Sequence, residues 1–148
     1  MVAQTTMKQI LVAVDEHPHA EEIVESAIRL ATPISAKILL MYVVTDKSVP
    51  TDYVDTHGDK LPEHYYQDRY LRTVGQLLKH IEKAGITCEA ICEAGDPQEL
   101  ILKTAKSKDV NYIVVGTRRL RYLSRLKAYG NVGRNVVENS SVPVLAVP

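Results

Sequence analysis

Short apolar runs alternate with amphipathic segments along most of the chain. Residues 9–14 (Gln-Ile-Leu-Val-Ala-Val) and 37–44 (Lys-Ile-Leu-Leu-Met-Tyr-Val-Val) are nearly continuous apolar runs, a pattern typical of strands covered on both faces. Between them, apolar residues recur at helical spacing from Ala20 to Ala31. A strand, a helix and a strand at this spacing predict a right-handed βαβ unit in a parallel sheet.

The same alternation continues to the end of the chain. Apolar residues at helical spacing run from Tyr66 to Ile81, after which Gly85 ends the predicted helix. Asp96 offers an N-cap side chain directly before Pro97, so a further helix is predicted to start there. The remaining predicted elements are strands at 86–92, 110–115 and 142–147 and a last helix at 132–138.

This order of elements indicates one α/β domain over residues 1–148. The expected fold is an open, parallel five-stranded sheet with helices on both faces. Pro143 lacks the N–H that a ladder requires, which favours an edge position for the last strand. An exposed Val-Leu-Ala-Val edge is expected to pair with a second copy. The sequence therefore predicts a homodimer through the C-terminal edge strand.

Composition limits the classes of function. Eighteen basic and 18 acidic residues give a formal net charge of +0, so no global field attracts nucleic acid or a membrane surface. No apolar run approaches the roughly 20 residues of a membrane span, and no signal peptide is recognisable. A cytoplasmic protein is expected. Cys88 and Cys92 would lie about 13 Å apart on one strand, beyond disulfide reach, so buried free thiols are predicted.

The candidate site follows from the expected sheet. Ligands of open parallel sheets bind beyond the carboxyl ends of the strands, where the strand order reverses. Asp15, Val43 and the pair Val115 and Gly116 lie at or after predicted strand ends. The segment 130–132 adds a glycine beside a helix start, where backbone N–H groups and the helix dipole favour an anion such as phosphate.

A basic segment lies between Gly116 and Glu138 and contains no acidic residue. It suits a solvated lid, a phosphate clamp or a nucleic-acid patch. The first two are favoured because nucleic-acid surfaces usually make a whole domain basic. Its basic residues are Arg118, Arg119, Arg121, Arg125, Lys127 and Arg134.

In order and spacing, these segments resemble the universal stress protein family over essentially the whole chain. The matching stretches are 10–15, 42–44, 95–97, 113–118 and 130–147. The resemblance implies a Rossmann-like, adenine nucleotide alpha hydrolase-like fold and a small cytoplasmic, homodimeric stress-response protein. It also implies that the ligand is ATP or another adenine nucleotide, with Mg²⁺ accompanying it.

Family members that bind ATP share a motif of Gly, two residues, Gly, nine residues, Gly and then Ser or Thr. Gly116 matches the first glycine and Gly130 the third. Arg119 stands at the second, the spacer is one residue longer, and Asn131 replaces the hydroxyl residue. The Arg119 side chain would either fill the ligand space or pair with phosphates through its guanidinium. Asn131 can still cap a helix and offer an amide.

By this resemblance, Asp15 would lie near the ribose or phosphates and Val43 against the adenine. Without it, Asp15 reads as a strand-end cap and Gly116 as a simple turn. The full set of expected ligand-binding residues is Asp15, Val43, Val115, Gly116, Arg118, Arg119, Gly130, Asn131 and Val132.

Two other functions stay open. A dimer that has lost nucleotide binding and acts through protein contacts would explain the altered motif. An enzyme is the third class, but the sequence offers no P-loop and no recognisable nucleophile with its base, so no catalytic residue is predicted. His17 and His19 flank Pro18 without a third metal ligand, and no metal site is predicted.

Overall fold

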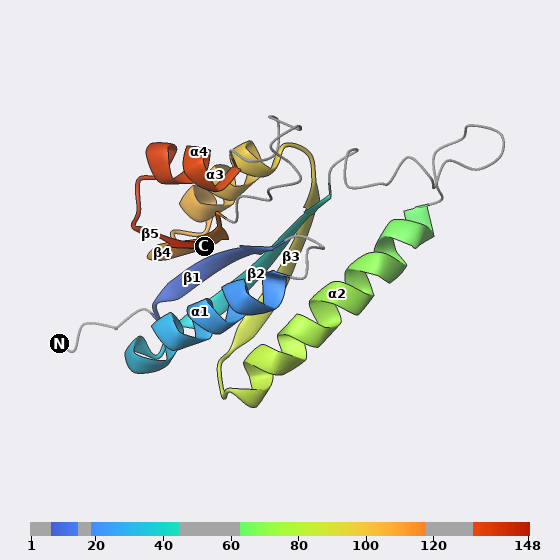
Figure 1. Cartoon of the computed structure of the whole chain (residues 1–148), viewed down its shortest axis with the longest axis horizontal. Coiled ribbons are helices and arrows are strands. Elements are labelled where there is room, and N and C mark those ends of the chain that lie inside the picture. Colours follow the sequence, from blue (N-terminus) through green and yellow to red (C-terminus); the bar gives the residue numbers. More distant parts are fainter. Residues whose placement is uncertain (1–6, 15–18, 45–62, 118–131) are drawn as a thin grey trace.

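A computed structural model describes residues 7–14, 19–44, 63–117 and 132–148, and shows a five-stranded parallel sheet with helices packed against it (Figure 1). This confirms the predicted fold class. The strands are β1 (Gln9–Val14), β2 (Lys37–Val44), β3 (Cys88–Ala94), β4 (Tyr112–Gly116) and β5 (Val144–Val147). The helices are α1 (Ala20–Ile34), α2 (Glu63–Lys83), α3 (Pro97–Ser107) and α4 (Val132–Asn139).

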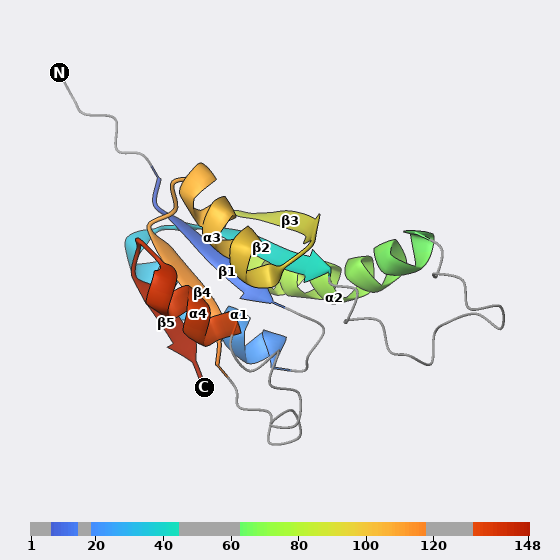
Figure 2. The ribbon, with the colours of Figure 1, turned by 90° about the horizontal axis from the view of Figure 1, so that it is seen from above.

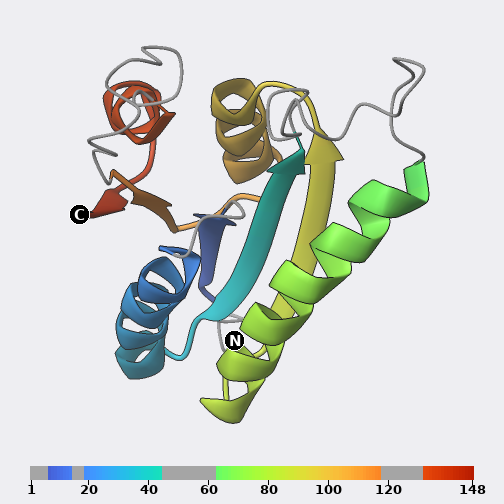
Figure 3. The same ribbon diagram turned by 45° about the vertical axis from the view of Figure 1, so that its right-hand side comes forward.

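Helices cover both faces of the sheet. Helices α1 and α2 pack on one face, and α3 and α4 pack on the other (Figure 3). Successive residues of a strand point to opposite faces, and the neighbours Leu39 and Leu40 of β2 are both buried, each in a different core. This two-sided burial explains the continuous apolar runs of β1 and β2.

The strand order reverses between β1 and β4. The sheet order is β3-β2-β1-β4-β5, so the chain builds outward from β1 through β2 to β3 and then crosses to β4 and β5 (Figure 2). All the strands are parallel, so their carboxyl ends share one edge of the sheet. Val14, Gly116 and Val147 end the adjacent strands β1, β4 and β5 at this edge. The last strand, β5, is the outermost strand of the sheet on the side of β4, so the prediction that it is an edge strand is confirmed.

Three strands begin two residues later than predicted. The N–H groups of Ile86 and Val110 donate to Ile81 and Ala105, in the last turns of α2 and α3, at 3.4 and 3.1 Å. These two residues therefore continue the hydrogen bonding of the helix ends, and the strands start after them. Pro143 precedes β5 and takes part only through its carbonyl, which accepts from the N–H of Ile113 at 3.0 Å. A proline cannot donate to the ladder, so the strand starts after it.

The start of α3 agrees with its sequence signal. Asp96 is the N-cap, and its side chain accepts a hydrogen bond from the N–H of Gln98 at 2.9 Å. Pro97 occupies the first helical position, where its missing N–H has no intrahelical partner to lose. This is one of the places where local chemistry alone sets an element boundary.

The prediction that both cysteines are buried is wrong. Both are free, but Cys88 is half-buried and Cys92 is exposed. Strand β3 is at the edge of the sheet opposite β5, so fewer side chains cover it. Partial burial, and secondarily the carboxylates of Glu82 and Glu93, raise the pKa of the Cys88 and Cys92 thiols respectively. Each thiol therefore favours its protonated form more than a free cysteine does.

Candidate functional site

Four of the nine expected ligand-binding residues lie in the described part of the chain: Val43, Val115, Gly116 and Val132. The other five are Asp15, Arg118, Arg119, Gly130 and Asn131, and they lie outside the described residues. The site can therefore be built from the ends of β2, β4 and β5 and from the first turns of α1 and α4.

The three valines contribute mainly to packing. Val43 and Val115 are buried, and Val132 is half-buried against the same core, on the face that α3 and α4 cover. They hold the ends of β2 and β4 and the start of α4 together. These side chains therefore belong to the core between the sheet and helices α3 and α4.

Gly116 ends β4 where α1 approaches most closely. A methyl group placed on its Cα would lie 2.7 Å from Cδ1 of Ile23 and 3.4 Å from Cδ2 of His19. The first of these separations is shorter than real Cβ contacts allow, so a side chain here would force the end of the buried Ile23 side chain to shift. The glycine thus brings the first turn of α1 onto the tip of β4.

Gly133 lies in the first turn of α4 and contacts the end of β4 from the face of the sheet opposite α1. A methyl group on its Cα would lie 2.6 Å from the carbonyl oxygen of Gly116 and 3.0 Å from Cγ2 of Thr117. The start of α4 therefore rests directly on the exit of β4. Sequence reasoning gave Gly133 no role. The available signal was a glycine inside a short helix, which costs about 1 kcal/mol relative to alanine and so suggests a packing reason.

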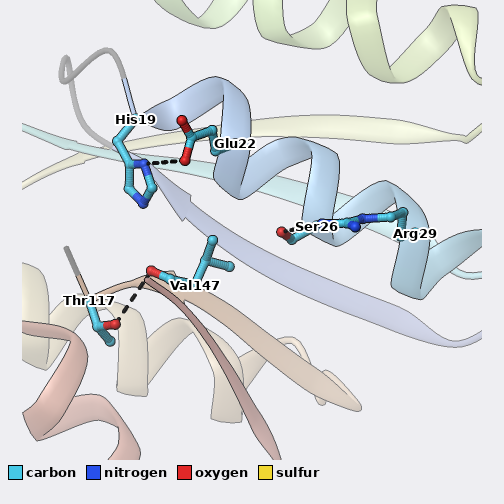
Figure 4. Close-up of polar contacts among 6 residues, drawn as sticks. All are labelled: His19, Glu22, Ser26, Arg29, Thr117 and Val147. Atoms are coloured by element: carbon cyan, nitrogen blue, oxygen red, sulfur yellow. Dashed lines mark hydrogen bonds and ion pairs between the residues drawn. The ribbon is translucent and has the colours of Figure 1, made fainter.

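Thr117 joins the exit of β4 to the end of β5. Its N–H donates to the carbonyl of Val147 at 2.8 Å, and its hydroxyl donates to the same oxygen at 3.4 Å (Figure 4). These bonds continue the β4–β5 ladder one residue past the strand. Thr117 is therefore held at the end of β5, beside the start of α4.

His19 is a second residue that sequence reasoning left without a site role. Its side chain is only 4% exposed, although it stands at the very start of α1. Nδ1 lies 3.0 Å from a carboxylate oxygen of Glu22, one turn along the helix, and the ring points toward the tips of β4 and β5 (Figure 4). Sequence patterns do not reveal this burial, because a polar residue before a helix normally faces solvent.

The two helix starts at this edge differ in charge. The first turn of α4 contains no acidic residue, so the partial positive charge of its N-terminus is not offset there. The first turn of α1 carries Glu21 and Glu22. Arg134, the one basic residue of the segment 116–138 that lies within the described ranges, is exposed and pairs with Glu138 at 2.9 Å along α4. An anion is thus favoured on the α4 side of the edge.

No group of three His, Cys, Asp or Glu side chains suited to a metal ion occurs among the described residues. Likewise, no helix in the described ranges has both the length and the apolar character that crossing a membrane requires.

Comparison with known proteins identifies relatives over the whole domain. The sequence model of the Universal stress protein family matches residues 6–148. Universal stress protein YxiE of Bacillus subtilis is 30% identical over 146 residues, which covers 94% of this chain and 97% of that protein.

Two solved structures share the fold. A universal stress protein family protein from Arabidopsis thaliana with AMP bound is 20% identical, with a TM-score of 0.66 over 95% of this chain and 90% of that one. The universal stress protein from Archaeoglobus fulgidus in complex with dAMP is 16% identical, with a TM-score of 0.66 over 97% of this chain and 98% of that one.

Proposed function

This chain belongs to the universal stress protein family, and we propose that it binds an adenine nucleotide at the carboxyl edge of its sheet. The observation that carries the proposal is that the starts of α1 and α4 both lie against the end of β4, next to the point where the strand order reverses. There, Gly116 and Gly133 allow two helix starts to meet the tip of β4 without an intervening side chain. Relatives of the same fold with AMP and dAMP bound support an adenine nucleotide as the ligand.

The described residues suit such a ligand. The start of α4 offers backbone N–H groups and a dipole without an acidic residue in its first turn, which favours phosphate. Val43 and Val115 supply an apolar floor at the ends of β2 and β4. In the proposed arrangement the adenine lies against Val43, and the phosphates lie toward Gly116 and the start of α4.

The finer parts of the proposal concern residues outside the described ranges and the protein's setting. We assign Asp15 to the ribose or the phosphates, Arg118 and Arg119 to the phosphates, and Gly130 and Asn131 to the phosphate-binding turn before α4. ATP would bind together with Mg²⁺. The protein would act in the cytoplasm as a regulator that signals through its bound state, and not as an enzyme.

Isothermal titration with AMP and ATP, with and without Mg²⁺, tests this proposal. We expect saturable binding of at least one nucleotide, and no release of phosphate from ATP above background. The matched variant is Val43→Ala, which shortens the apolar floor and should weaken binding of AMP and ATP alike. Absence of binding by the unmodified protein up to millimolar nucleotide would refute the proposal, and phosphate release abolished by Asp15→Ala would refute the non-enzymatic part.

The outer edge of β5 supports a homodimer. Leu145 of β5 is 41% exposed and Val137 of α4 is 47% exposed, two of the three large apolar side chains exposed in the described ranges. Leu145 belongs to the edge strand β5, and Val137 belongs to α4, which packs against β5. A second copy pairing along β5 would cover them and satisfy the open backbone edge. A dimer that binds no nucleotide and acts through protein contacts is the second candidate function, and this edge favours it equally.

Sedimentation velocity tests the proposed dimer. The unmodified chain should sediment as a dimer, and Leu145→Lys should shift it to the monomer, because a charge then faces the apolar interface. Met7→Lys is the control, since Met7 is exposed but lies ahead of β1, away from that edge. A monomer for the unmodified chain, or a dimer that survives Leu145→Lys, contradicts pairing through this edge.

A further inference from the structure

Two short elements, α4 and β5, contribute to both of the surfaces proposed above. Helix α4 begins with Gly133 against the end of β4, where the phosphates are proposed to bind, and carries the exposed Val137 one turn further on. Strand β5 is the outer edge of the sheet and carries the exposed Leu145. The proposed nucleotide site and the proposed dimer surface therefore share one part of the fold.

Hydrogen bonds stabilise the connection between α4 and β5. The hydroxyl of Ser140, the first residue after α4, donates to the carbonyl of Val142 at 2.7 Å and accepts from the N–H of Val142 at 3.1 Å. The carbonyl of Pro143 then accepts from the N–H of Ile113 in β4 at 3.0 Å. Because the connection between them is short and internally hydrogen-bonded, we expect α4 and β5 to move together.

Thr117 connects the other end of β5 to the start of α4. Its N–H and its hydroxyl both donate to the carbonyl of Val147, the last residue of β5, at 2.8 and 3.4 Å (Figure 4). Its Cγ2 lies 3.0 Å from the position of a methyl group on Gly133, in the first turn of α4. A shift of β5 would therefore disturb the residue against which the start of α4 packs.

In a single copy, one ladder holds β5 to the sheet. The strand spans four residues, pairs with β4 alone among the described strands, and leaves Leu145 and Ala146 exposed. Helix α4 is also short, with eight residues, of which Gly133 and Val136 are buried. Segments with few buried apolar contacts open at the lowest free-energy cost in a fold. A partner strand on the outer side of β5 would add a second ladder and hold both elements in place.

We propose that nucleotide binding and dimerisation strengthen each other through α4 and β5. Pairing of two copies along β5 favours the arrangement in which α4 rests on the end of β4, and this arrangement is the one that binds phosphate. Coupling between two binding events is reciprocal, so a nucleotide that binds the dimer more tightly also stabilises the dimer. The inference rests on the proposed nucleotide site and the proposed dimer, and adds their mutual regulation.

Two independent measurements test the coupling. Calorimetric titration with AMP, and in parallel with ATP, gives the dissociation constant of each nucleotide for the unmodified dimer and for the variants Leu145→Lys and Leu145→Glu, which are both expected to be monomers. These variants place opposite charges on the edge strand, so a loss of affinity common to both reports the loss of the dimer and not the new charge. Sedimentation equilibrium gives the dimer dissociation constant of the unmodified protein with and without saturating nucleotide.

We expect the unmodified dimer to bind nucleotide at least about fivefold more tightly than either monomeric variant, which is the lower end of usual coupling between sites. Because the dimer holds two sites, saturating nucleotide should lower the dimer dissociation constant by the square of that factor, about 25-fold. The two results are linked by a thermodynamic cycle and must agree.

Ser140→Ala tests the connection between α4 and β5 itself. The substitution removes the hydroxyl that bonds to both backbone groups of Val142, at the opposite end of α4 from Gly133. The variant should still dimerise and bind nucleotide, but with a coupling factor closer to one. The control is Ser107→Ala, which removes a hydroxyl bond to the carbonyl of Thr104 at the end of α3 and should leave the factor unchanged. Thermal unfolding without nucleotide checks that each variant is folded.

The possible failures are distinguishable. If the unmodified protein binds neither AMP nor ATP, the proposed function is wrong, and if it sediments as a monomer, the proposed dimer is wrong; the coupling is lost with either. If the protein binds nucleotide and dimerises, but the dimer and both monomeric variants have the same nucleotide affinity, those two proposals stand and the coupling is wrong. A coupling factor that Ser140→Ala leaves unchanged overturns the role of α4 and β5 in it.

Discussion

Replacing Gly133 with alanine is expected to lower the free energy of unfolding by about 1–3 kcal/mol, the usual cost of overpacking, and to weaken nucleotide binding by more than about tenfold. The added methyl group would lie 2.6 Å from the carbonyl oxygen of Gly116, a backbone atom that cannot rotate away. Helix α4 must then move off the tip of β4, and the proposed phosphate site moves with it. Urea unfolding and calorimetric titration with AMP measure the two effects.

The control for this substitution is Gly75→Ala in α2. Apart from its chain neighbours and the backbone of its own helix turn, nothing lies within 4 Å of the methyl position at Gly75, and alanine is a better helix former than glycine by about 1 kcal/mol. This variant should therefore be slightly more stable than the unmodified protein and bind AMP equally well. If Gly133→Ala behaves like Gly75→Ala in both measurements, the close approach of α4 to β4 does not position the site.

Truncation of either neighbouring leucine of β2 should destabilise the fold strongly. Leu39 and Leu40 are 1% and 0% exposed and belong to the cores on opposite faces of the sheet. Leu39→Ala and Leu40→Ala should each lower the free energy of unfolding by about 2–5 kcal/mol, because each leaves a cavity in a packed interior. Urea unfolding monitored by circular dichroism gives both values.

Met7→Ala serves as the comparison for these two variants. Met7 is exposed, so its truncation should change stability by less than about 0.5 kcal/mol. The informative result is that Leu39→Ala and Leu40→Ala should lower the free energy of unfolding by similar amounts. A sheet with helices on one face only would leave one of the two adjacent side chains exposed, and one variant would then resemble Met7→Ala.

Local patterns predicted the order and type of the elements well. The bounds of β1 and β2 agree with the apolar runs residue by residue, and α3 starts at the cap and proline that its sequence shows. These elements were readable because their signals are local: continuous apolarity for a strand buried on both faces, and side-chain capping for a helix start. The order of matching segments also identified the family.

The boundaries of β3, β4 and β5 were less readable. Ile86 and Val110 have strand-like side chains, but their N–H groups bond back to the preceding helices. Which acceptor a backbone N–H takes depends on how the helix end meets the sheet, and the residue type does not record this. The exposure of Cys92 has a similar origin, because the position of β3 at an edge follows from strand order and not from its own residues.

The sequence by itself determined an α/β fold with a parallel sheet and the order and type of its strands and helices. Periodicity and capping are properties of short segments, so they are fully present in the chain. Only the tertiary structure brought Gly116, Gly133 and His19 together, from β4, α4 and α1. These three residues are far apart in the chain. The distances between them depend on the strand order and on how closely the helices pack against the sheet, and no short segment of the sequence encodes either.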